Sequence, residues 1–89
     1  MEKVYSLKII YNSGDSKVLG GRAAEPQYLY AVFDGMIDEQ EYQSISASHP
    51  SSSEVLIHAS RIFKSRFKDL ARIEIINIKT NTIVDFINC

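Results

Sequence analysis

The sequence predicts a small single-domain α+β protein over residues 1–89, with the element order β-β-α-α-α-β-β. Two observations lead to this prediction. Each end of the chain carries two apolar segments separated by turn residues, which is typical of a β-hairpin. The middle of the chain has helical periodicity and two capping signals. Because an isolated hairpin is unstable in water, we expect both hairpins to join in one four-stranded antiparallel sheet, with the helices packed on one face.

The first predicted hairpin covers residues 4–19. Its first strand, residues 4–11, alternates so that one face is apolar, formed by Tyr5, Leu7, Ile9 and Tyr11. The segment 12–15, Asn-Ser-Gly-Asp, has turn residues, and 16–19 is expected to return as a short strand. Gly20-Gly21 is expected to end the hairpin, because consecutive glycines lose much backbone entropy inside a strand.

A short helix is predicted over residues 26–34. Pro26 suits the first helical position, and the apolar residues that follow fall within one broad face: Tyr28, Leu29, Val32, Phe33 and Met36. The alternative is a β-hairpin over residues 28–42 that turns at Asp34-Gly35. The poor strand propensity of residues 38–41 disfavours this alternative.

The segment 35–42 predicts the end of one helix and the start of the next. Gly35 can take the left-handed conformation at a helix C-terminus. Asp38 and Glu41 have the spacing of a capping box. This segment resembles the turn of short helical-hairpin modules in many unrelated proteins, and the likeness implies no activity.

The longest helix is predicted over residues 51–70, after a serine-rich linker at 44–53. Ser51 and Glu54 form a second capping box, and one apolar stripe follows: Val55, Leu56, Ala59, Ile62, Phe63, Phe67 and Leu70. Two residues break the pattern. Arg66 projects into the stripe, so we expect it either to extend past the helix end or to pair with Asp85 or Glu74. Ile57 projects among basic residues, so it is either covered by the preceding helices or exposed for contact.

The chain is expected to finish with a second hairpin, with strands at 73–78 and 82–87. Both of its faces carry apolar residues, whereas one layer of helices covers only one face of a sheet. We therefore expect a homodimer whose contact includes Ile73–Ile78 and Val84–Ile87.

Composition excludes several classes of protein. The chain is 45% hydrophobic and 24% charged with a net charge of −1, which is typical of a globular domain and does not favour polyanion binding. It has no apolar run near the roughly 20 residues of a membrane span and no apolar leader. The one cysteine, Cys89, cannot form an internal disulfide. A cytoplasmic location is therefore expected.

The residues that could support catalysis are few. His49 and His58 are the only histidines, and their spacing does not place them on one helix face. The serines near His49 are better explained as loop and cap residues, because acyl transfer requires a fixed nucleophile and base. No metal-ligand motif and no phosphate-binding loop is present in the sequence. We therefore expect no enzyme activity, no metal and no cofactor.

The charges are segregated along the chain. Residues 23–60 contain six acidic residues and no lysine or arginine, whereas residues 61–79 contain six basic residues and two acidic ones. The two blocks either neutralise each other in the fold or meet partners of opposite charge.

These features predict a protein-interaction module that acts by stoichiometric binding through charged surfaces, as an inhibitor or adaptor. The candidate partner-binding residues are Tyr30, Asp34, Asp38, Glu39, Glu41, Ile57, Arg61, Lys64 and Lys68. The alternative is nucleic-acid binding through the basic face of the helix 51–70. In size and charge pattern the chain is similar to small inhibitors of host defence nucleases that phages and other mobile elements carry, which is an analogy and not a family assignment.

Overall fold

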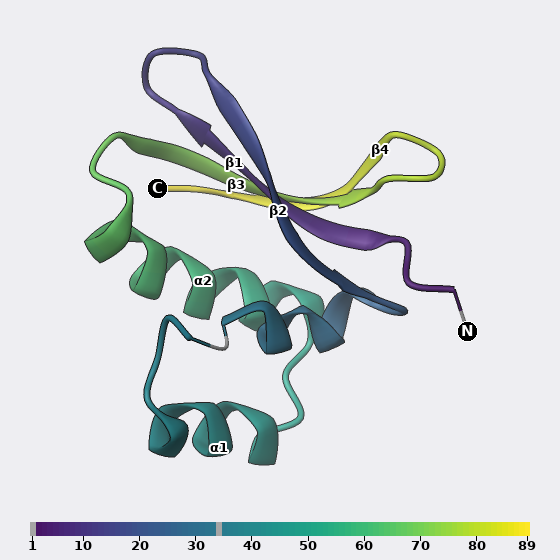
Figure 1. Ribbon diagram of the computed structural model, residues 1–89, viewed down its shortest axis with the longest axis vertical. Helices are drawn as coiled ribbons and strands as arrows, with labels where there is room; N and C mark the ends of the chain where they lie inside the picture. Colours follow the sequence, from purple (N-terminus) through teal and green to yellow (C-terminus); the bar gives the residue numbers. More distant parts are fainter. Residues whose placement is uncertain (1, 34) are drawn as a thin grey trace.

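The computed structural model describes residues 2–33 and 35–89. The elements in chain order are β1 (Tyr5–Tyr11), β2 (Ser16–Ala23), the 3₁₀ helix η1 (Pro26–Phe33), α1 (Glu39–Ala47), α2 (Ser52–Arg66), β3 (Leu70–Asn77) and β4 (Thr82–Asn88). The strands form one antiparallel sheet in the order β2-β1-β3-β4, and the helices lie on one side of it (Figure 1). The predicted α+β class and four-stranded sheet are confirmed.

The core lies between the two central strands and α2. Leu7 and Ile9 on β1 stand opposite Ile75 and Ile73 on β3, and all four side chains are fully buried. The apolar stripe of α2 covers them with Val55, Leu56, Ala59, Ile62 and Phe63, as the helical periodicity predicts. Burial of each large apolar side chain contributes about 1.5–3 kcal/mol, so this layer is the main source of stability.

The middle of the chain is helical, so the alternative β-hairpin over residues 28–42 is wrong. The first helix is a 3₁₀ helix that ends at Phe33, and Asp34 lies outside the described residues. Gly35 has a φ of 83°, the left-handed conformation expected of a residue that follows a helix end. The helix α1 lies farther from the sheet than α2 and packs mainly on η1 (Figure 1).

Two predicted helix boundaries are wrong. The helix α1 continues to Ala47 through part of the expected linker, because burial of Ile45 outweighs the weak helix propensity of its neighbouring serines. The helix α2 ends at Arg66 and not at Leu70, since Phe67 already has an extended conformation. Leu70 instead begins β3 and pairs with Tyr11. Apolar periodicity cannot distinguish these outcomes, because Leu70 is buried in either element.

The glycine pair does not end β2, which continues to Ala23. The pairing of β1 with β2 shifts between Ser6 and Lys8, opposite the glycines. At this irregularity the buried Ser6 hydroxyl donates toward two backbone carbonyl oxygens. That of Leu19 lies 2.8 Å away and that of Gly21 lies 2.9 Å away. Glycine is needed at position 21 for another reason: an added Cβ would lie 2.7 Å from Cγ2 of Val32 on η1.

Replacement of Gly21 by alanine is therefore expected to lower the free energy of unfolding by about 1–3 kcal/mol, because Val32 must move. Urea denaturation measures the change. Gly20→Ala is the matched control, since a Cβ there would meet nothing within 4 Å. Val32→Ala added to Gly21→Ala should recover part of the loss. Equal effects of the two glycine substitutions would contradict the proposed steric role of Gly21.

Candidate interaction surfaces

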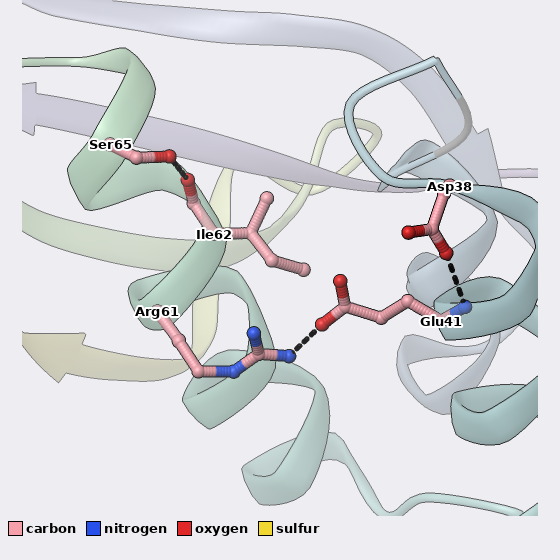
Figure 2. Close-up of polar contacts among 5 residues, drawn as sticks. All are labelled: Asp38, Glu41, Arg61, Ile62 and Ser65. Carbon is pink, nitrogen blue, oxygen red and sulfur yellow. Dashed lines mark hydrogen bonds and ion pairs between the residues drawn. The ribbon is translucent and has the colours of Figure 1, made fainter.

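The acidic segment has a structural role at Asp38. Its side chain accepts a hydrogen bond from the Glu41 backbone N–H at 2.7 Å and caps α1, as the capping-box spacing predicts (Figure 2). Glu39, in the first turn, is exposed, and no ion pair of this residue occurs among the described residues. Asp34, the other candidate here, lies outside the described residues. The acidic candidates therefore have different roles.

The acidic and basic blocks meet at one ion pair. Arg61 on α2 donates a hydrogen bond from Nη2 to Oε1 of Glu41 on α1 (Figure 2). This contact links the outermost helix to α2. The charges of these two candidate residues are therefore partly neutralised within the fold.

Tyr30 contributes to packing between η1 and α1. Its ring centroid lies 5.7 Å from that of Tyr42, and its hydroxyl oxygen lies 3.5 Å from Oγ of Ser46. Tyr30 therefore does not project from a free side of η1, because α1 packs against that side. Replacement of Tyr30 would therefore disturb the fold as well as any binding surface.

The remaining basic candidates are exposed. Lys64 lies on α2, and Lys68 lies in the turn after the helix. Among the described residues neither forms an ion pair. Arg66 is also exposed, at the end of α2, and donates a hydrogen bond to the Gly35 carbonyl oxygen at 3.1 Å. It therefore extends past the helix end and does not pair with Asp85 or Glu74.

Large apolar side chains are exposed on both sides of β4: Phe86 pairs with Glu74 on the sheet face away from the helices, whereas Ile57 lies on α2 on the helix side. We call Ile57, Ile83, Val84 and Phe86 together the β4 surface. These side chains are 58%, 55%, 47% and 48% exposed, respectively. Ile57 and Phe86 also line one shallow depression between α2 and β4. The sequence left open whether the preceding helices cover Ile57 or leave it exposed. In the structure they do not cover it.

The expected dimer contact is narrowed by the position of β3. This strand lies between β1 and β4, and Ile73, Ile75 and Ile76 are buried within the chain. Their side chains are therefore not on the surface of the chain, and the dimer itself stays a prediction. The exposed apolar residues of the last hairpin belong to β4. Residues 82–88 contain no lysine, arginine or proline, the residues that commonly protect an exposed strand edge.

A buried carboxylate lies on the sheet face away from the helices. Glu74 is 4% exposed, and its Oε2 lies 3.0 Å from Nε of Arg72. The guanidinium carbon of Arg72 lies 3.8 Å from the centroid of the Phe86 ring. Arg72 thus shields Glu74 and supports Phe86 by a cation–π contact, which holds the ring at the β4 surface.

The two histidines lie apart in different elements. His49 is exposed in the turn before α2, with a φ of 49°, and lines an open pocket of about 480 Å³ together with Tyr28 and Tyr30. Ser51, nearby, accepts a hydrogen bond from the Glu54 backbone N–H at 3.3 Å and so serves as the helix cap. His58 is half-buried on α2. The described residues contain no group of three or more His, Cys, Asp or Glu side chains that could hold a metal ion.

Comparison with known proteins gives no relative: no family model, no curated protein and no solved structure matches this chain. Within the described part of the chain, no helix has the length and apolar character needed to cross a membrane.

The structure separates the capping role of Asp38 from the charge of its neighbour. Asp38→Ala is expected to lower the free energy of unfolding by about 0.5–2 kcal/mol, because α1 loses its cap. Glu39→Ala is the matched control and should change it by less than about 0.5 kcal/mol. Thermal and urea unfolding measure both. An equal loss in the two variants would show that the charge of this segment matters and the cap does not.

Proposed function

We propose that this protein is a non-enzymatic protein-interaction module that acts by stoichiometric binding, as an inhibitor or an adaptor. The observation that carries the proposal is the β4 surface. Four of the six large apolar side chains that are exposed among the described residues belong to it. Scattered exposed apolar residues are common in soluble proteins, but a cluster of them is typical of a binding site.

Charged residues beside the β4 surface would contribute to the rate and selectivity of binding. Arg61 and Lys64 follow Ile57 at helical spacings of four and seven residues, so they continue the same exposed side of α2. Such flanking charges steer a partner of opposite sign and add less to affinity than buried apolar contacts. An acidic rim around an apolar centre on the partner would fit this arrangement.

Nucleic-acid binding through α2 is the weaker proposal. Arg61 already pairs with Glu41, which leaves Lys64 and Lys68 as the main cations of that face. Phosphate binding usually needs several cations together and falls steeply with salt concentration. A partner that stays bound in high salt would favour the protein-interaction proposal over this one.

The β4 surface can be tested by capture of partners from the native host with immobilised protein, followed by mass spectrometry. We expect the wild type and Val18→Lys to recover the same partner and Val84→Lys to lose it. Val18 is the matched control, because it is also a valine on an outer strand and is 48% exposed. Equal recovery with all three proteins would exclude the β4 surface as the binding site.

The non-enzymatic proposal predicts that His49→Gln combined with His58→Gln leaves partner binding and biological activity unchanged. Neither histidine lies in an arrangement that a proton transfer or a metal ion requires. Circular dichroism checks the fold of the double variant. Loss of activity in a variant that stays folded and still binds its partner would be evidence for catalysis.

A further inference from the structure

The two edges of the sheet differ in how they are covered. The β2 edge lies against η1, where Val32 approaches Gly21. The outer edge of β4 pairs with no other strand of the described chain (Figure 1). Such an edge has backbone groups that can pair with a further strand. The strand β4 therefore offers unpaired backbone groups at its outer edge as well as exposed apolar side chains.

The backbone hydrogen bonds show which groups of β4 point outward. The Cys89 N–H donates to the Ala71 carbonyl oxygen at 2.9 Å, one position beyond the pairing of Arg72 with Asn88. Hydrogen-bonded pairs alternate along an antiparallel ladder. Ile87 and Asp85 therefore direct their backbone groups toward β3, whereas Phe86 and Asn88 direct theirs to the open edge.

A hydrogen bond of Asp85 agrees with the outward direction of the Phe86 N–H. The same bond limits access to the edge. Oδ1 of Asp85 accepts a hydrogen bond from the Phe86 N–H at 2.8 Å, so that N–H is not used within the sheet. A charged residue of this kind restrains pairing at an exposed strand edge. A strand that binds here must displace the Asp85 carboxylate from the Phe86 N–H.

We propose that the occupant of this edge is β4 of a second copy of the chain, in an antiparallel arrangement that joins the two sheets into one. This inference rests on the proposed function, because it assigns an occupant to the same β4 surface. In the favoured register Phe86 lies opposite the partner's Phe86, and Asp85 lies opposite the partner's Ile87. A shift that brings Val84 opposite the partner's Phe86 would place the two Asp85 carboxylates opposite each other, which like-charge repulsion disfavours. The net charge of −1 opposes self-association only weakly.

The apolar area available on β4 is small. About half of the surface of each of Ile83, Val84 and Phe86 is exposed, which is well below the about 800 Å² per partner of a standard interface. We therefore expect a weak, reversible dimer.

Sedimentation equilibrium from about 5 to 500 μM tests the dimer. We expect the wild type and Val18→Lys to dimerise equally and Val84→Lys to stay monomeric. Asp85→Ala removes the competing acceptor and should tighten the dimer about fivefold, the equivalent of one hydrogen bond. A monomeric wild type at all concentrations would overturn this inference. It would not affect the proposed function if Val84→Lys still loses a different partner from the host.

Amide hydrogen exchange then tests strand pairing in the wild type. The Phe86 and Asn88 amides should become more protected as the concentration rises, and those of β2 should not change. A dimer that Val84→Lys abolishes but that leaves the Phe86 and Asn88 amides unprotected would be a side-chain contact without strand pairing, which overturns the inference. A dimer that Val18→Lys abolishes would place the contact on β2 and overturn it as well.

Discussion

The pairing of β1 with β3 holds the two ends of the chain together, and the other elements are arranged around it. Seven residues of β1 pair with residues of β3 that come 59 to 72 positions later in the sequence. The fully buried pairs Leu7 with Ile75 and Ile9 with Ile73 form the floor on which α2 packs. Because β1 and β3 take the central positions, β2 and β4 become the edges. The placement of the β4 surface therefore follows from this one pairing.

Most of the notable charges act within the chain. Asp38 caps α1, Glu41 pairs with Arg61, and Arg66 binds a backbone carbonyl at the turn before α1. The last two contacts attach the outer helix and its preceding turn to α2, each at modest free energy because they are exposed to water. What remains for binding is largely apolar. The segregation of charge in the sequence is thus explained in part by how α1 attaches to α2.

Local chemistry made the helical turn and the caps predictable. The spacing of Asp38 and Glu41, and of Ser51 and Glu54, identified both helix starts, and both hydrogen bonds are present. The apolar stripe of α2 identified the core helix. The candidate site was predicted less well. Ile57 was correctly singled out as anomalous, but the packing of Tyr30 against Tyr42 was not predicted, because Tyr42 comes from another helix.

The sequence by itself determined the class of fold, the order of the strands along the chain and the helix caps, because these depend on periodicity and on contacts between residues a few positions apart. Only the tertiary structure decided that β2 runs through its glycines, that Leu70 belongs to a strand, and that β3 is central and β4 is an edge. These outcomes depend on contacts between distant segments, such as Val32 against Gly21 and β1 against β3. Intrinsic propensities of a few tenths of a kcal/mol per residue do not override such packing.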